Sequence, residues 1–366
     1  METEKLRKIP APLLAWFADH ARVLPWREQP TPYYVWVSEI MLQQTRVEAV
    51  KPFFARFTEA LPDVKALAAC QEDRLLKLWE GLGYYNRVRN MQRAAQIVVE
   101  QYGGELPAKY EVLIGLPGIG SYTAGAVASI AGGQAVPAVD GNVLRVISRV
   151  VGYTKDVLKQ SSKREFEQAL QAVMPSEHPG AFNQALMELG ATVCVPNGAP
   201  TCHDCPLRQI CFAAATGRQM EFPVKAAKKE RRIEERTVLV IRDSTRAVLH
   251  RRPDKGLLAG MYELPNYTGY LGQEEVIARV RDLGFEPVRI WPLPSAKHIF
   301  SHVEWQMAGY MVLIEESEKS DCGGNVLFVE PERTQREYSI PAAFAAYAEY
   351  LSIRLGQKKY EEENKI

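Results

Sequence analysis

Four cysteines in one short segment constrain the fold of this 366-residue chain more than any other feature. They follow the spacing C-x7-C-x2-C-x5-C, at Cys194, Cys202, Cys205 and Cys211. Disulfides are rare in long chains that work inside cells, because thiols are kept reduced there. Thiols this close in sequence therefore predict a metal site, and both zinc and iron–sulfur clusters take cysteine ligands.

Composition and charge exclude two classes of protein. No apolar run reaches the roughly 18 to 20 residues that span a bilayer. The opening "METEKLRKIP" lacks the apolar segment of a secretory signal, so we expect a soluble cytoplasmic protein. The net charge is only +1, so local patches and backbone N–H groups would have to bind any nucleic acid, because there is no global basic field.

The chain changes character after Cys211. Before it, apolar spacing predicts helices near residues 70–80, 87–102, 109–115, 121–131, 142–151, 163–174 and 181–192. After it, a charge run typical of a solvated linker leads into β-rich stretches such as "TVLVIRDSTRAVLHRR", in which a turn at Asp243 and Ser244 separates two predicted strands. We predict a helical domain over 1–220, a linker over 221–236, an α+β domain over 237–355 and a tail over 356–366.

A glycine pair separates two of the predicted helices, in the stretch "LPGIGSY". Gly118 and Gly120 permit positive φ and close approach of backbones. Such a turn exposes backbone N–H groups at the start of the next helix, where a DNA phosphate can bind without sequence readout. A tight turn between packed helices explains the same residues, and the Ala/Gly/Ser-rich helix that follows also fits close packing.

Two carboxylates have sequence surroundings that suggest chemistry. Asp140 precedes "GNVLRV" and is predicted to cap a helix, which would hold it rigid and ionised. Glu39 lies beside an apolar stripe in a helix that Thr31 and Pro32 are predicted to begin, and burial there would raise its pKa. A protonated acid and an ionised acid together can break a glycosidic bond, by activating the leaving group and stabilising an oxocarbenium-like sugar.

Several motifs together resemble the helix-hairpin-helix DNA glycosylases of the endonuclease III superfamily. The resemblance covers about residues 10–212 and rests on "LPGIGSYTAGA", "VDGNVLRV" and the four cysteines. The stretches "LPWR", "VSEIMLQQT", "GLGYYNRVRN" and "FNQALMELGA" narrow it to the MutY-type adenine DNA glycosylases. The α+β part is similar to the family's Nudix-like second domain. This resemblance implies an enzyme that flips adenine mispaired with 8-oxoguanine out of double-stranded DNA and excises it.

The resemblance also implies catalytic roles. Glu39 would protonate the adenine, and Asp140 would stabilise the deoxyribose cation. Tyr122 and Asn142 would position these two groups. Lyase-active relatives have a lysine at the position of Tyr122, which attacks the sugar as an amine. Tyrosine cannot do so, and we therefore expect a monofunctional glycosylase that uses water.

Further positions match the family's contacts with DNA. The adenine pocket would be lined by Trp26, Arg27, Leu42, Gln44, Gln184 and Met187. Gln44 and Thr45 also match positions near the oxidised guanine, and Tyr84 matches a wedge that enters the base stack. "KHIFSHVEW" resembles the loop that contacts 8-oxoguanine, with Phe300, Ser301 and His302 at its tip. Core packing, or a strand end with a turn, explains these residues without DNA.

The resemblance implies a 4Fe–4S cluster on the four cysteines, fixing the loop 194–211. The family usually has six residues between the first two cysteines, whereas this chain has the seven of "VPNGAPT". The second domain has Glu274 and Glu275 but lacks the "REVxEE" pattern of pyrophosphate hydrolases. Lesion recognition is therefore its expected role.

Two alternative functions remain open. An endonuclease III-like enzyme acting on damaged pyrimidines would share the hairpin and the cysteines, although Tyr122 and the second domain argue against it. A non-catalytic protein that binds DNA lesions would need a similar surface but would release no base. We expect a monomer that acts at the bacterial nucleoid.

Overall fold

The computed structural model describes residues 3–226, 230–316 and 325–355. The isolated Cys322 and the predicted tail over 356–366 lie outside these residues. Among the helices that are described, none is both long and apolar enough to cross a bilayer.

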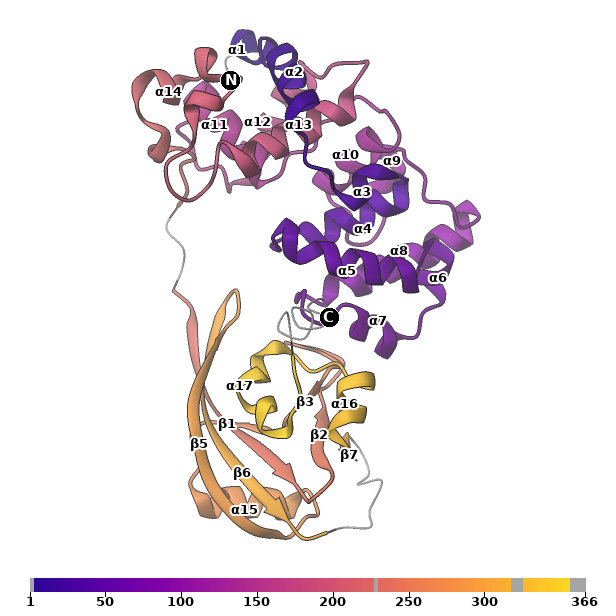
Figure 1. The fold of residues 1–366 in the computed structure, drawn as a ribbon, viewed down its shortest axis with the longest axis vertical. Coiled ribbons are helices and arrows are strands. Elements are labelled where there is room, and N and C mark those ends of the chain that lie inside the picture. Colours follow the sequence, from indigo (N-terminus) through magenta and orange to yellow (C-terminus); the bar gives the residue numbers. More distant parts are fainter. Residues whose placement is uncertain (1–2, 227–229, 317–324, 356–366) are drawn as a thin grey trace. The chain divides into compact units, whose positions relative to one another are not determined.

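The chain forms two compact units, each with its own core (Figure 1). The first consists of Met1–Ala69 and Asn90–Lys228, and the second of Cys70–Arg89 and Lys229–Ile366. The sequence predicted one helical domain over 1–220. The structure differs in two respects, because residues 70–89 group with the β-rich part of the chain and a strand begins at Arg232, inside the predicted linker.

The first unit is helical. Its elements are α1 (Thr3–Arg7), α2 (Pro10–His20), α3 (Pro25–Glu28), α4 (Pro32–Leu42), α5 (Val47–Ala60), α6 (Val64–Ala69), most of α8 (Asn86–Tyr102), α9 (Tyr110–Leu113), α10 (Ser121–Ile130), α11 (Gly141–Val151), α12 (Gln160–Gln171), α13 (Pro179–Thr192), α14 (Phe212–Thr216) and the 3-10 turns η1 (Cys202–Asp204), η2 (Arg208–Ile210) and η3 (Gln219–Glu221). The predicted start of α4 is confirmed, since the Thr31 side chain accepts a hydrogen bond from the Tyr34 N–H. One core joins α1, α2 and α11 to α13 around residues such as Leu13, Ile147 and Phe182.

The glycine-rich hairpin joins α9 to α10 and packs closely against α8. Gly118 has a φ of +76°, and a Cβ atom there would lie 2.6 Å from the Cβ of Asn90. Gly120 has a φ of −94°, so Gly118 alone of the predicted pair uses the left-handed region that glycine favours. Further along α10, a Cβ at Gly125 would collide with the carbonyl oxygen of Pro137. The small residues of α10 therefore allow close packing, and this packing fixes where its side chains point.

The second unit is built on a mixed sheet. Its elements are α7 (Glu72–Leu78), β1 (Arg232–Arg242), β2 (Ala247–Arg251), β3 (Tyr262–Glu263), β4 (Asn266–Thr268), α15 (Gln273–Asp282), β5 (Pro287–Ile299), β6 (Val303–Ile314), β7 (Val326–Val329), α16 (Pro331–Glu337), η4 (Ala342–Phe344), α17 (Ala345–Ala348) and η5 (Glu349–Leu351). The strand order is β3-β2-β1-β6-β5, with β4 beside β1 and β7 beside β2. β1 and β6 run parallel, and the predicted turn at Asp243 joins β1 to antiparallel β2.

Both faces of this sheet are covered, because β1 alternates its side chains between two cores. Val238 and Val240 pack in the core that contains Phe344 and the residues around α17. Leu239 and Ile241 pack in the core that contains Val276 and Val280 of α15. The predicted α+β domain is therefore a sheet between two helical layers.

Residues 70–89 join the second unit through polar contacts with the segment after α16. Lys77 Nζ donates to the carbonyl of Tyr338 at 2.8 Å. The Glu80 carboxylate accepts from the Ile340 N–H at 3.0 Å. These contacts place the "GLGYY" turn, which follows α7, in the same unit as the β5–β6 hairpin.

Candidate active site

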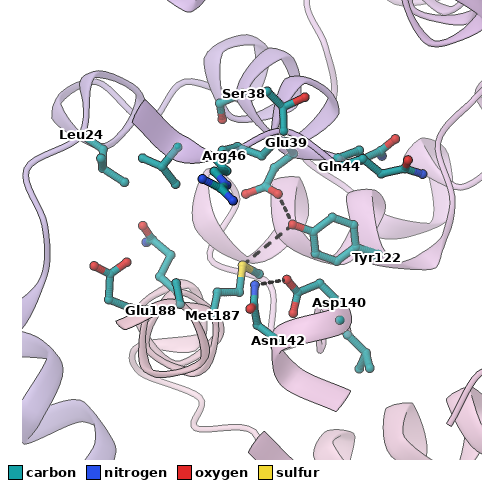
Figure 2. Close-up of a pocket in the computed structure, with 18 of the residues that line it drawn as sticks. Leu24, Ser38, Glu39, Gln44, Arg46, Tyr122, Asp140, Asn142, Met187 and Glu188 are labelled. Atoms are coloured by element: carbon teal, nitrogen blue, oxygen red, sulfur yellow. Dashed lines mark hydrogen bonds between the residues drawn. The ribbon is translucent and has the colours of Figure 1, made fainter. Parts of the chain in front are cut away.

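A pocket of about 1150 Å³ opens among the helices of the first unit. Side chains enter it from α3, α4, α10, α13 and the start of α11 (Figure 2). Most of the residues predicted for catalysis or base binding line it, namely Trp26, Arg27, Glu39, Leu42, Gln44, Thr45, Tyr122, Asp140, Asn142, Gln184 and Met187. The fold thus brings Glu39 and Asp140, which are far apart in sequence, to one cavity.

Glu39 is a buried carboxyl at the wall of this pocket. It is 6% exposed, on α4 among the buried Trp36 and Ile40. Burial is the main cause that raises the pKa of Glu39 to about 7. A hydrogen bond from Tyr122 opposes this rise, Asp140 adds to it, and the charge of Arg27 opposes it. A carboxyl that keeps its proton near neutral pH is suited to act as a general acid.

Asp140 caps α11, as predicted. Its Oδ1 accepts from the Val143 N–H at 2.7 Å, and its Oδ2 accepts from the Asn142 side-chain amide at 2.7 Å. Burial raises the pKa of Asp140, and these two donors and the charge of Arg145 oppose the rise. The backbone N–H of Asn142 opposes it as well. Because these four groups favour the ionised form, Asp140 is the member of the carboxylate pair that is suited to stay charged.

Tyr122 connects the two sides of the pocket (Figure 2). Its hydroxyl donates a hydrogen bond to Glu39 Oε2 and lies 3.9 Å from the Met187 sulfur. Burial raises the pKa of Tyr122 well above its ordinary value, so the phenol remains a neutral donor.

Two other residues predicted to bind the base also line the pocket. Gln44 has a strained backbone, and Trp26 belongs to both the core and the pocket wall. Gln44 follows α4 with a φ of +65°, a conformation that costs energy in a residue with a Cβ and often marks a functional site. Trp26 is buried and meets Phe54 edge-on at 5.4 Å between ring centroids. Trp26 is thus both core and pocket wall, and the two interpretations left open by the sequence are compatible.

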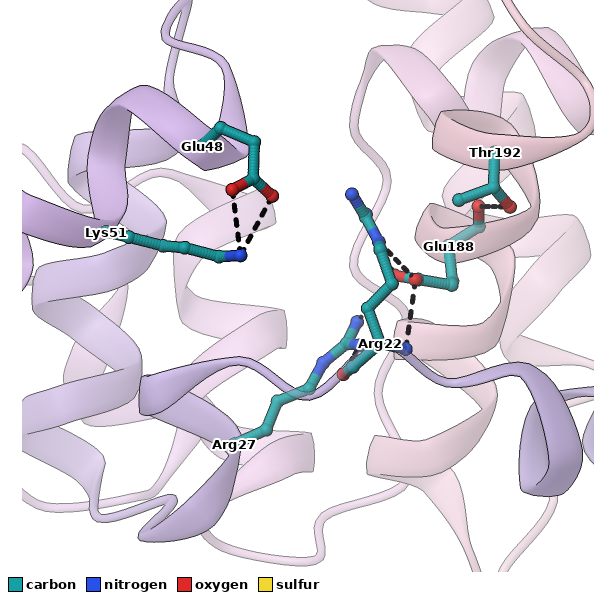
Figure 3. Close-up of polar contacts among 6 residues, drawn as sticks. All are labelled: Arg22, Arg27, Glu48, Lys51, Glu188 and Thr192. Carbon is teal, nitrogen blue, oxygen red and sulfur yellow. Dashed lines mark hydrogen bonds and ion pairs between the residues drawn. The ribbon is translucent and has the colours of Figure 1, made fainter.

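A third carboxylate of the pocket, Glu188, escaped the sequence-based prediction. Its side chain is 1% exposed and accepts hydrogen bonds from both Arg22 and Arg27 (Figure 3). Glu188 follows the predicted Gln184 by four residues on α13, so helical spacing placed them on one face. Arg22 had no such signal, because its partner lies far away in the sequence.

The four cysteines surround one small cavity, with Arg149 and Gln219 at its edge. Arg149 Nη1 donates to the Cys194 sulfur at 3.2 Å, and Gln219 Nε2 lies 3.9 Å from that of Cys202. Within the described residues, no three His, Cys, Asp or Glu side chains converge as the ligands of one metal ion do. The donor set is thus four sulfurs spread around a shared space.

Arg145 joins the cysteine loop to the candidate active site. Its Nε donates to the Cys194 carbonyl at 2.7 Å, and its Nη2 donates to Asn142 Oδ1 at 2.7 Å. Asn142 in turn donates to Asp140. The position of Asp140 is therefore tied by two side chains to the position of the loop.

In the second unit, Phe300–His302 form the turn between β5 and β6. This agrees with the strand end and turn that the sequence suggested for this stretch. The Phe300 N–H donates to the Val303 carbonyl at 2.8 Å, and the Phe300 ring packs edge-on against Trp305 at 4.9 Å. Ser301 and His302 are exposed. Phe300 thus anchors the turn, and its two neighbours remain available for contacts.

Tyr84 lies beside this turn, within the same unit. Its hydroxyl and Ser301 Oγ are 3.0 Å apart. Tyr84 is 51% exposed and has a φ of +49°, so core packing does not explain its side chain. Arg87 stabilises the "GLGYY" turn, which contains Tyr84, by donating to the carbonyls of Leu82 and Gly83. We call Tyr84 and Phe300–His302 the recognition tip.

Sequence comparison identifies two families along the chain. Residues 37–175 match the HhH-GPD superfamily of base excision DNA repair proteins. Residues 237–350 match the NUDIX domain. The adenine DNA glycosylase of Mus musculus is 34% identical over 84% of this chain and 71% of its own length. That of Homo sapiens is 32% identical over 94% and 74%, respectively.

Solved structures match the helical part. A thermostable thymine-DNA glycosylase superposes with a TM-score of 0.52 and 26% identity, over 59% of this chain and all of the other. A trapped endonuclease III–DNA covalent intermediate gives a TM-score of 0.51 at 24% identity, over 59% and 99%. At 24% identity, the similarity to the endonuclease III structure shows a shared fold and no more.

Proposed function

This chain belongs to the adenine DNA glycosylases, base excision repair enzymes of the HhH-GPD superfamily, and we propose that it excises adenine opposite 8-oxoguanine in duplex DNA. The observation that carries the proposal is the pairing of Glu39 and Asp140 across one cavity. Base flipping would bring the adenine there.

The proposed reaction is hydrolysis assisted by an acid. Glu39 gives its proton to the adenine, which weakens the bond between N9 and the sugar C1′. As that bond breaks, its electron pair leaves with the base, and the ionised Asp140 stabilises the cation on the sugar. Water then adds its hydroxyl to C1′ and gives up a proton.

Tyr122 supports the absence of lyase chemistry. A phenol that donates to Glu39 can orient the acid but cannot form a Schiff base with the sugar. We therefore propose a monofunctional enzyme. Borohydride trapping should leave no covalent adduct with DNA, and an adduct would favour an endonuclease III-like reaction.

The backbone of the hairpin and the recognition tip are proposed to hold the DNA. N–H groups near Gly118 and Gly120, at the start of α10, would bind a phosphate. In the second unit, Tyr84 would wedge into the stack beside 8-oxoguanine. The Ser301 hydroxyl, which can donate or accept, would sense its N7–H and O8. The short contact between Tyr84 and Ser301 supports a shared role.

The four cysteines are proposed to hold a 4Fe–4S cluster. Such a cluster gives each thiolate its own iron, which suits sulfurs around a common cavity better than convergence on one zinc. Bound there, the cluster would cross-link the loop 194–211. The absorption spectrum and iron content of the purified protein test this, since a zinc site would be colourless and free of iron.

Base release tests the proposed function directly. Purified protein in excess over a duplex that contains the mispair should release adenine in a single turnover. Glu39→Gln keeps the shape of the side chain but has no proton to give, and should lower the rate about a thousandfold. Full activity of that variant would rule out this role for Glu39. Tight binding without release by the unaltered protein would instead support a non-catalytic lesion binder.

A further inference from the structure

Glu188 is a buried carboxylate that the proposed reaction does not use. It lines the same pocket as Glu39 and Asp140. A buried charge is costly unless it is paired and hydrogen-bonded, so the reason for its presence must lie with its partners. Hydrogen bonds and charge from Arg22 and Arg27 lower the pKa of Glu188 against the effect of burial. Glu188 is therefore an anion that belongs to a cluster of three charges.

The contacts of Glu188 fix both arginines. Arg22 donates from Nε to Oε1 at 2.5 Å and from Nη2 to Oε2 at 3.1 Å. This two-point contact sets the plane of the guanidinium. Arg27 donates from Nη2 to Oε2 at 2.9 Å and from Nη1 to the Arg22 carbonyl at 3.0 Å. Figure 3 shows both guanidinium groups gathered at this one carboxylate.

An exposed ion pair in the same region provides a contrast. Lys51 and Glu48 pair at 2.9 Å on α5, with the Glu48 side chain 74% exposed. Such pairs contribute little, because solvent screens them and their side chains are mobile. The Glu188 carboxylate, by contrast, is shielded from solvent, and it holds two cations at the wall of a pocket that must receive a base.

We propose that Glu188 is a positioning residue for base excision, which locks the guanidinium groups of Arg22 and Arg27 and balances their charge beside the acid Glu39. The inference rests on the proposed function. Its chemical basis is local charge balance, since the cluster has two positive groups and one negative group at the pocket wall.

The acid Glu39 senses this balance because Arg27 lies close enough to oppose its protonation. The groups that act directly on Glu39 are Tyr122 on α10, Arg27 on α3 and Asp140 before α11. The other charged groups around the pocket are Arg22, Arg46, Glu48, Arg145, Lys163 and Glu188. Removing the negative charge of Glu188 leaves Arg27 less compensated, which favours ionised Glu39. Removing the positive charge of Arg22 acts in the opposite direction.

The test is the pH profile of adenine release in a single turnover, which isolates the chemical step. The rate should fall as pH rises through the pKa of the acid. Glu188→Gln should move this alkaline limb to lower pH by about one unit, as loss of a nearby compensating charge does. Arg22→Gln should move the limb upward. Glu165→Gln removes the same charge at a solvent-accessible position outside the pocket, where Glu165 pairs with Lys155 at 2.8 Å, and is the matched control, with a limb that stays in place.

Opposite shifts distinguish positioning by charge from simple packing. If both variants move the limb the same way, or neither moves it beyond the Glu165→Gln control, the inference is overturned. If Glu188→Gln has no cooperative melting transition, Arg22→Gln decides alone, since Arg22 is partly exposed. Absence of adenine release by the unaltered protein would overturn the proposed function and this inference together. Normal release by the unaltered protein with unshifted variants would overturn this inference alone.

Discussion

The pocket of the first unit and the recognition tip of the second differ in how their functional groups meet water. In the pocket, Glu39 and Glu188 are almost fully buried, and burial is the main cause that raises the pKa of Glu39. At the tip, Ser301 and His302 are exposed, and Tyr84 projects into solvent. The Ser301 hydroxyl and the Tyr84 ring need no altered pKa to contact a base.

The difference fits the two tasks that we propose for these regions. Breaking a bond near neutral pH requires groups whose protonation differs from that in water, and desolvation supplies this difference. Reading a base requires donors, acceptors and a flat apolar surface that can be reached. We expect substitutions in the pocket to change the chemical rate strongly, and substitutions at the tip to change binding and selectivity more weakly.

Asp140→Asn should produce the largest effect. Asparagine caps a helix about as well as aspartate, so the free energy of unfolding should change by about 1 kcal/mol or less. Loss of the charge beside the sugar cation should nevertheless lower single-turnover release about a thousandfold or more. The rate and the melting temperature measure the two consequences separately.

Two results would contradict this expectation. A large fall in melting temperature would make the cap, rather than the charge, the reason for lost activity. A rate within tenfold of the unaltered protein would show that Asp140 is a cap alone, which is the simpler explanation of its place before α11. Either result would remove the contrast between pocket and tip.

Local rules predicted the parts of this molecule that local interactions determine. The cap at Thr31, the cap at Asp140 and the turn after β1 all depend on residues within a few positions of each other. Resemblance supplied the site residues, because spacing alone could not distinguish a pocket wall from a core.

Contacts between distant segments were beyond prediction from the sequence. Arg22 and Glu188 are 166 positions apart, and no periodicity joins the segment after α2 to α13. Residues 70–89 group with the second unit through Lys77 and Glu80, whose partners lie some 260 positions away. Gly118 and Gly120 look equivalent in sequence, yet only Gly118 has a left-handed backbone and lies against Asn90, where a Cβ would not fit.

Tyr84→Ala should have an intermediate effect, at the tip. Loss of a side chain that enters the stack should slow release from duplex about ten- to fiftyfold, since a base must be unstacked at a cost of a few kcal/mol. Release from single-stranded DNA should be affected much less, because no stack has to be opened. Tyr270→Ala, at a similarly exposed tyrosine of the same unit (52%), is the control and should act like the unaltered protein. Equal losses on both substrates would place the role of Tyr84 in the pocket chemistry and erase the distinction between the two regions.

Ser301→Ala should have the smallest effect and should concern selectivity. The substitution removes a hydroxyl that is exposed and that pairs with Tyr84 at 3.0 Å, so folding has little to lose. One neutral hydrogen bond contributes about 0.5 to 1.5 kcal/mol, which predicts a preference for 8-oxoguanine over guanine that falls by about three- to tenfold. The measurement is kcat/KM for adenine opposite each base, with the rate opposite guanine nearly unchanged. If both rates fell together, Ser301 would merely hold Tyr84 in place, and reading of the oxidised base would have to be sought in His302 or in the backbone of the turn.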